Sequence, residues 1–90
     1  MFTQKELDVV DIDYFHVIQI SAYAVTLQSK NTHHCWHIIS QSYGKFVSCQ
    51  IYHTHHKYQP YHLHRSASCI QAAIEAIKRH DTYQLNGRKA

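Results

Sequence analysis

Histidine is the residue type with the most chemistry to offer in this sequence, and ten of the 90 residues are histidine. Neutral imidazole is the commonest metal ligand in proteins, so the spacing of these side chains bears on zinc binding. The triplet His33-x-Cys35-x-His37 places three ligand atoms on one face of an extended strand. Same-face neighbours lie ~6.6–6.8 Å apart along a strand, so the outer two lie ~13 Å apart and cannot both join Cys35 on one tetrahedral ion. At most two of these three residues can belong to one zinc site.

Two closer histidine pairs are better chelators than this triplet. In His53-x-His55 and His62-x-His64 the two imidazoles share a strand face and can converge on one ion. The three cysteines form no C-x-x-C pair, and solvated histidines explain the pattern simply, so we expect no cofactor. Zinc is the alternative. A zinc site would draw on His34, His53, His55, His62 and His64.

A nucleophilic cysteine is the second chemistry that the residue types offer. Cys69 stands at the start of a predicted helix, where the helix dipole lowers a thiol pKa, and His62 and His64 precede it. Catalysis by cysteine and histidine also needs an orienting group and an oxyanion hole, and neither has a sequence signature here. Most acidic residues fall within the first thirteen, so paired catalytic carboxylates are not indicated either. We therefore expect Cys69 to be a small packed residue and the protein not to be an enzyme.

The densest set of binding side chains is a basic and aromatic stretch. It contains His53, His55, His56, Lys57, Tyr58, Tyr61, His62, His64 and Arg65. Three further candidates are Tyr52, Arg88 and Lys89. Aromatic rings interleaved with hydrogen-bond donors suit stacking on exposed bases and bonding to phosphate. This pattern favours a small non-enzymatic binding module associated with nucleic acid.

The same residue types also suit a protein partner, because interfaces are enriched in Tyr, Trp and Arg. The alternative function is therefore a protein-binding inhibitor or adaptor that acts through an open sheet face or an edge strand. A second helix or a second copy of the chain, in a homodimer, could also cover that face. A zinc-stabilised small domain is the remaining alternative.

Charge is distributed unevenly along the chain. Residues 1–13 carry four acidic residues against Lys5, a net charge of −3, whereas residues 14–90 carry eight basic residues against Glu75 and Asp81, a net charge of +6. A basic body suits nucleic acid or an acidic protein surface.

The elements that must position these residues are mostly strands. Between Asp13 and Gln28, Tyr23, Val25 and Leu27 alternate with smaller or polar residues, as in a half-buried strand. Ile18 and Ile20 have the opposite parity from Tyr23, so we expect a bulge or break near residues 21–22.

Two further strands are predicted to follow as a meander. A turn at residues 30–31 would pair Leu27 with His34 and Val25 with Trp36. An even loop near residues 41–45 then puts Trp36 and Ile38 on the same face as Val47, Cys49 and Ile51. Residues 59–65 add a short fourth strand, which Pro60 restricts to an edge.

Both predicted helices carry a capping-box pattern, Thr3-x-x-Glu6 for a short first helix and Ser68-x-x-Gln71 for the last one. In the last helix, four residues follow with the spacing of one helical face: Ile70, Ala73, Ile74 and Ile77. The sequence therefore predicts an α+β fold. It is a small antiparallel meander of three to four strands, covered on one face by a C-terminal helix, with a short N-terminal helix.

The length predicts a single domain over residues 1–90. Its parts are an acidic leading segment (1–13), a sheet (14–65), a helix (66–81) and a basic tail (82–90). No apolar run approaches the ~20 residues of a membrane span, and no secretory signal is visible. With three cysteines in no disulfide-like pattern, we expect a cytoplasmic protein without a membrane partner.

Overall fold

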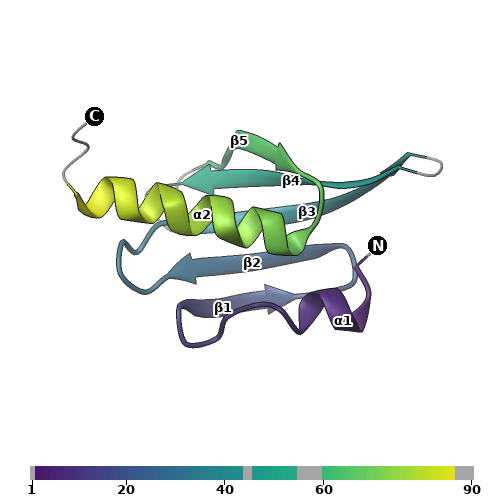
Figure 1. Cartoon of the computed structure of the whole chain (residues 1–90), viewed down its shortest axis with the longest axis horizontal. Coiled ribbons are helices and arrows are strands. Elements are labelled where there is room, and N and C mark those ends of the chain that lie inside the picture. Colours follow the sequence, from purple (N-terminus) through teal and green to yellow (C-terminus); the bar gives the residue numbers. More distant parts are fainter. Residues whose placement is uncertain (1, 44–45, 55–59, 87–90) are drawn as a thin grey trace.

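The computed structural model describes residues 2–43, 46–54 and 60–86 (Figure 1). Two helices and five strands follow in the order α1 (Gln4–Leu7), β1 (Phe15–Ile20), β2 (Ala24–Ser29), β3 (Cys35–Tyr43), β4 (Phe46–Thr54), β5 (His62–Ala67) and α2 (Ile70–Leu85). Neither described helix is long and apolar enough to cross a membrane.

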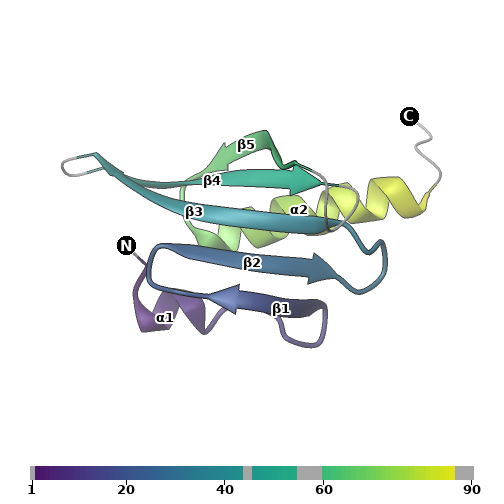
Figure 2. The same ribbon diagram turned by 180° about the vertical axis from the view of Figure 1, so that it is seen from behind.

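The strands form one antiparallel sheet in the order β1-β2-β3-β4-β5, so each strand pairs with its neighbour in sequence. Helix α2 lies across one face of the sheet, which we call the helix side (Figure 1). Seen from behind, the strands lie in front of the helix, and we call this the open face (Figure 2). The α+β class, the antiparallel sheet and both helices are confirmed, and the described sheet has one strand more than the three to four predicted.

The additional strand arises where the sequence predicts a bulge or break. The chain reverses direction between Ile20 and Ala24, so that β1 and β2 form a hairpin. The Ser21 N–H donates to the Ala24 carbonyl at 2.9 Å, and the Ser21 hydroxyl accepts from the Ala24 N–H at 3.1 Å. Across this turn, even-numbered residues at the end of β1 share a sheet face with odd-numbered residues of β2, as Ile20 does with Val25. This change explains why the apolar residues before and after the turn differ in parity. The one bulge in this pair lies between Val17 and Gln19 instead.

The hairpin between β2 and β3 has the predicted faces but a different register. Leu27 lies opposite Trp36, and Val25 lies opposite Ile38, each two residues further along than predicted. The predicted two-residue turn is too short, because His33 donates its N–H to the Ser29 carbonyl at 2.9 Å and adopts a left-handed φ of 63°. A shift of two residues leaves every side chain on its face, so the predicted core face is correct.

The next two strand pairs agree better with the sequence. Strands β3 and β4 pair from Cys35 opposite Thr54 to Tyr43 opposite Phe46, which is the even connection predicted. Strand β5 is an edge strand, as predicted, but it begins at His62 and ends at Ala67, slightly later than residues 59–65.

The core lies between the helix side of the sheet and α2. Its fully buried members include Phe15, Leu27, Trp36, Ile38, Ile51, Ile70 and Ile77. Helix α2 runs from Ile70 to Leu85, whereas the sequence predicts residues 66–81. The capping box predicted there is wrong, because Cys69 is the N-cap residue and its side chain makes no capping hydrogen bond.

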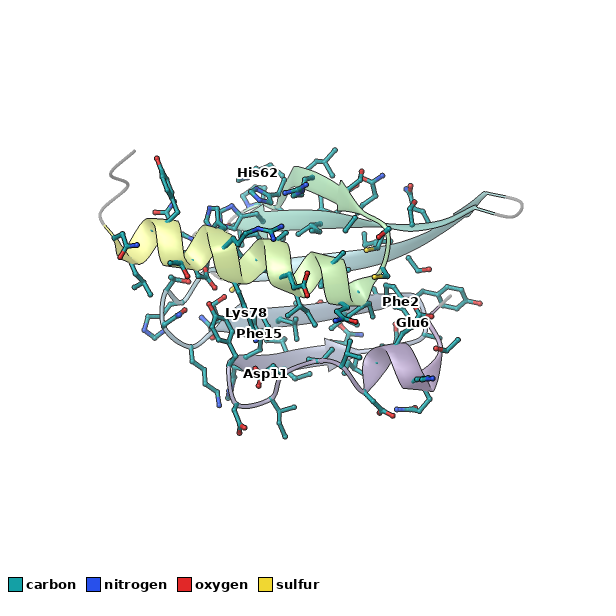
Figure 3. The ribbon with its side chains drawn as sticks, in the orientation of Figure 1. Phe2, Glu6, Asp11, Phe15, His62 and Lys78 are labelled. Carbon is teal, nitrogen blue, oxygen red and sulfur yellow. The ribbon has the colours of Figure 1, made fainter. Side chains whose placement is uncertain are left out.

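The leading segment packs into the same core. The capping box of α1 is present, with Glu6 N–H bonded to the Thr3 hydroxyl at 3.2 Å and Thr3 N–H bonded to Glu6 at 3.1 Å. Phe2 and Val10 are buried against the sheet. Farther along, Lys78 of α2 reaches Asp11 at 2.9 Å, and Figure 3 shows the two side chains facing one another. The segment before β1 is therefore joined to α2.

Candidate functional site

The structure divides the predicted binding stretch between the two sides of the sheet. Tyr52 and Tyr61 line a hollow on the open face. Four other residues of the set lie on the helix side: His53, His62, His64 and Arg65. The remaining predicted binding residues, His55, His56, Lys57, Tyr58, Arg88 and Lys89, lie outside the described residues. The described members of the set thus contribute to two separate surfaces.

Five histidines gather on the helix side, where β4, β5 and the second half of α2 meet. We call this the histidine cluster, and its members are His34, His53, His62, His64 and His80. His53 is only 2% exposed, and His34 and His80 are half-buried. His62 and His64 are exposed on edge strand β5. The position of His62 beside β5 is visible in Figure 3.

The histidine cluster surrounds the buried indole of Trp36. The Trp36 ring stacks on His53 with centroids 4.2 Å apart, and His80 and His64 meet it edge-on at 5.0 Å and 5.4 Å. The indole N–H donates to the Ser29 hydroxyl at 3.1 Å, which fixes the orientation of the ring. The fixed Trp36 ring therefore restrains the imidazoles of His53, His64 and His80, which pack against it.

Within the histidine cluster, three imidazoles bring their ring nitrogens together. The nitrogen atoms of His34, His53 and His80 that face one another all lie within 4.8 Å. His53 Nε2 and His34 Nδ1 share a hydrogen bond at 3.0 Å. Such nitrogens are good ligands for zinc, copper and nickel. Of the predicted zinc residues, His34 and His53 belong to this group, His62 and His64 lie at its margin, and His55 lies outside the described residues.

His80 is the member that the sequence reasoning missed. The predicted helix ends at residue 81, which places His80 in its last turn, but α2 continues to Leu85 and His80 lies inside it. The available signal was its spacing, because His80 and Asp81 follow Ile77 at i+3 and i+4 and therefore continue the buried face. Both side chains do point inward, and Asp81 is fully buried.

Asp81 is held by hydroxyl groups from distant parts of the chain. Tyr14 donates its hydroxyl to Asp81 at 2.7 Å, and Thr32 donates to the other carboxylate oxygen at 3.0 Å. Burial and the neighbouring carboxylate raise the pKa of Tyr14 to about 12, so the phenol remains a donor at neutral pH. One Asp81 oxygen also lies 3.9 Å from His80 Nδ1.

Burial and neighbouring charges lower the pKa of one member of the histidine cluster, His64. The pKa of His64 is lowered, first by burial and then by the positive charge that His80, Arg65 and His62 can carry. At neutral pH the His64 imidazole is therefore uncharged, the form that can share a site with other imidazoles.

A second candidate site is the hollow on the open face. It encloses about 430 Å³ and is lined by Thr26, His37, Ile39, Tyr52 and Tyr61. Thr26 Oγ1 and His37 Nδ1 are 2.7 Å apart, and the rings of His37 and Tyr61 lie 5.7 Å apart. Burial lowers the pKa of His37 and raises that of Tyr61, so both rings are neutral at pH 7. Neutral rings around a hollow suit stacking of another planar group.

A third surface lies along edge strand β1. Its apolar side chains Val17, Ile18 and Ile20 are 37%, 42% and 45% exposed. The flanking segments add Val9, Ile12 and Tyr23 at 43%, 70% and 65%. We call these six residues the β1 apolar surface. An edge strand with exposed apolar side chains is a site where a further strand can pair.

Cys69 lies at the opposite end of α2 from the histidine cluster. It is the N-cap residue and precedes His80 by eleven positions, which corresponds to ~16 Å at ~1.5 Å per residue. The Cys69 thiol and the His80 imidazole are therefore too far apart to act together.

Comparison of the chain with protein-family models, with curated proteins and with solved structures found no match.

Proposed function

We propose that the chain is a non-enzymatic domain that binds another protein at the β1 apolar surface. The observation that carries this proposal is where the exposed apolar residues fall. Six of the nine large apolar side chains exposed among the described residues lie between residues 9 and 23, on β1 or on the segments beside it. Exposed apolar area concentrated in one region is typical of an interaction site.

The charges near this surface support a protein partner over a nucleic acid. Asp8 and Asp13 are exposed in the segment before β1, and the first thirteen residues carry a net charge of −3. Lys78 pairs with Asp11 and Lys30 donates to the Ile12 carbonyl, so it is the exposed carboxylates of Asp8 and Asp13 that favour a segment with basic residues over phosphate. Among the described residues, no strand places Lys or Arg on the open face, because Arg65 points to the helix side with Arg79.

The partner chemistry follows from these features. We assign to the partner an extended segment that pairs with the edge of β1, carries alternate apolar side chains and has basic residues nearby. Main-chain hydrogen bonds supply affinity in such strand addition, and the side-chain positions supply specificity. Three cysteines without disulfide-like spacing support a reducing compartment such as the cytoplasm for this encounter.

Site-specific photo-crosslinking in cells that produce the chain tests the proposal. Benzoylphenylalanine replaces Ile18 in one variant and Leu85 in the matched control, because Leu85 is an exposed apolar residue of α2. We expect a protein adduct from position 18 that disappears in the Ile20→Asp background and is not formed from position 85. Equal adducts from both positions, or adducts only with nucleic acid, would overturn the assignment.

A second candidate function is single-stranded nucleic-acid binding, and the hollow on the open face favours it. Its volume and its rings at His37, Tyr52 and Tyr61 suit one stacked base. Fluorescence anisotropy with a short labelled oligonucleotide decides the matter. Binding at near-physiological salt that is lost in Tyr52→Ala and retained in Tyr83→Ala, an exposed tyrosine of α2, would support this function. No binding by protein confirmed as folded would exclude it.

A further inference from the structure

The histidine cluster has the composition and the spacing of a metal site. His34 precedes β3, His53 lies in β4 and His80 lies in α2, so the three imidazoles come from three separate parts of the chain. Their facing nitrogens lie within 4.8 Å of one another. Because the three imidazoles are far apart in the sequence, it is the tertiary fold that brings them together.

The distances can be compared with those of a tetrahedral ion. Zinc–nitrogen bonds of ~2.0–2.1 Å at tetrahedral angles place neighbouring ligand nitrogens about 3.3 Å apart. The His53 and His34 nitrogens are 3.0 Å apart, close to this value. The remaining separations, at most 4.8 Å, must close by about 1.5 Å or less. Small side-chain rotations achieve such a change.

The surroundings restrain the ligands. Stacking on Trp36 fixes the ring of His53, which is 98% shielded from solvent. Asp81 is fixed by Tyr14 and Thr32, and its carboxylate lies 3.9 Å from the His80 ring. At 3.9 Å the carboxylate makes no hydrogen bond to the ring and acts on a bound cation through its charge. The buried carboxylate also offsets the charge of a cation.

We infer that His34, His53 and His80 form a binding site for a divalent transition-metal ion of the zinc class. Three imidazoles without thiolates suit zinc, cobalt, nickel and copper, and exclude the hard ions magnesium and calcium, which prefer oxygen ligands. His64 of β5 lies beside the triad, with its ring centroid 5.2 Å from that of His80 and 5.8 Å from that of His53. Among the described residues, the nitrogens that lie within 4.8 Å of one another belong to His34, His53 and His80, so His64 borders this three-imidazole site.

Such an ion would join the sheet to the helix. His53 belongs to β4 and His34 directly precedes β3, whereas His80 belongs to α2. An ion that binds the folded chain more tightly than the unfolded chain stabilises the fold in proportion to the logarithm of its concentration. We therefore expect zinc to raise the melting temperature and magnesium to leave it unchanged.

Trp36 is the single tryptophan of the chain and provides a built-in reporter for this site. Co²⁺ is paramagnetic, and its fluorescence quenching is strongest in close contact with an indole. Titration of untagged protein with Co²⁺ should quench Trp36 with a stoichiometry of one ion per chain, and Zn²⁺ should reverse the quenching. The bound Co²⁺ should also show the intense visible absorption of tetrahedral coordination. Absence of saturable quenching in folded protein would overturn the inference.

Three variants distinguish this site from histidines elsewhere. His80→Ala should weaken Co²⁺ binding by at least ~10-fold, because loss of a ligand costs no less than loss of its supporting partner. The matched control His16→Ala, in exposed edge strand β1, should bind as the unsubstituted chain does. A double variant, His55→Ala with His56→Ala, tests the neighbouring histidines in the sequence. If this double variant abolishes quenching while His80→Ala does not, the assignment is wrong.

The inference does not depend on the proposed function. Its ligands lie on the helix side, in β4, in α2 and directly before β3, whereas the protein partner is assigned to β1. Metal binding without crosslinking at position 18 would support the metal site and contradict the protein interface. Crosslinking without metal binding would support the protein interface and contradict the metal site. If His80→Ala fails to fold, the Co²⁺ spectrum and the quenching stoichiometry of the unsubstituted chain still decide the question.

Discussion

At the scale of single residues, burial controls the titration of His37 on the open face. Its folded-state pKa is lowered by burial, so the unfolded chain takes up a proton on this side chain more readily than the folded chain. The resulting stability is complete above the unfolded pKa of ~6.5 and is lost as pH falls below it toward the folded pKa.

Urea unfolding at pH 7.5 and pH 5.5 tests this effect of His37. The free energy of unfolding should fall less between these two pH values in His37→Gln than in the unsubstituted chain, because glutamine does not titrate. The control is His16→Gln, which changes an exposed histidine. An identical fall in all three proteins would show that His37 contributes nothing to the pH dependence.

The three thiols should differ sharply in reactivity. Cys35 and Cys49 are fully buried, whereas Cys69 is half-buried at the start of α2. Burial raises the pKa of Cys49 to about 11, so only about one molecule in a thousand carries its thiolate at pH 8. A disulfide-exchange reagent at pH 8 should label one thiol quickly in the folded chain and three in denaturant. Two fast thiols, or a fast thiol that survives Cys69→Ser, would contradict the described burial.

At the scale of elements, the apolar face of α2 determines how the helix is held on the sheet. Ile74 is 5% exposed and faces the strands, so Ile74→Asp buries a charge without a partner. We expect a loss of at least ~3 kcal/mol in the free energy of unfolding. The control Gln71→Asp introduces the same residue at an exposed position of the same helix and should change stability by no more than ~0.5 kcal/mol. A loss under ~1 kcal/mol for Ile74→Asp would mean that this face is assigned wrongly.

The alternation of apolar and polar residues along the strands explains which features of the sheet could be predicted from the sequence. Alternation placed Trp36, Ile38, Cys49 and Ile51 on one face, and all four are buried there. Alternation repeats every two residues, however, so it could not distinguish Leu27 opposite His34 from Leu27 opposite Trp36. The deciding contacts belong to a turn with a left-handed residue that is not glycine, which carries no strong sequence signal.

The candidate sites were harder to predict because tertiary contacts create them. His53 has the parity of Ile51 and could have been assigned to the core face, but its neighbours in sequence suggested a surface stretch. The approach of His80 to His34 and His53 depends on where α2 crosses the sheet. Similarly, the hollow on the open face joins Thr26, His37 and Tyr61 from three parts of the chain, and no local pattern contains them.

At the scale of the whole molecule, the chain separates two surfaces by the width of its sheet. The β1 apolar surface and the histidine cluster lie toward opposite edges, with β2 and β3 between β1 and β4 (Figure 1). Strands are spaced ~4.8 Å apart, so β1 and β4 are separated by about 14 Å. Effects of substitutions more than ~7–10 Å apart without shared partners usually add.

If the two surfaces are independent, the effects of Ile18→Asp and of zinc on the melting temperature should add. Zinc should raise the melting temperature of Ile18→Asp by the same amount as it raises that of the unsubstituted chain, because the variant alters only the β1 apolar surface. The same zinc addition should raise the melting temperature of His80→Ala much less, since one ligand is missing. Differential scanning calorimetry at matched protein and zinc concentrations measures all three shifts. A zinc shift that is reduced by Ile18→Asp as strongly as by His80→Ala would mean that the two surfaces are coupled through the sheet, and that the metal and the protein partner cannot be treated as independent ligands.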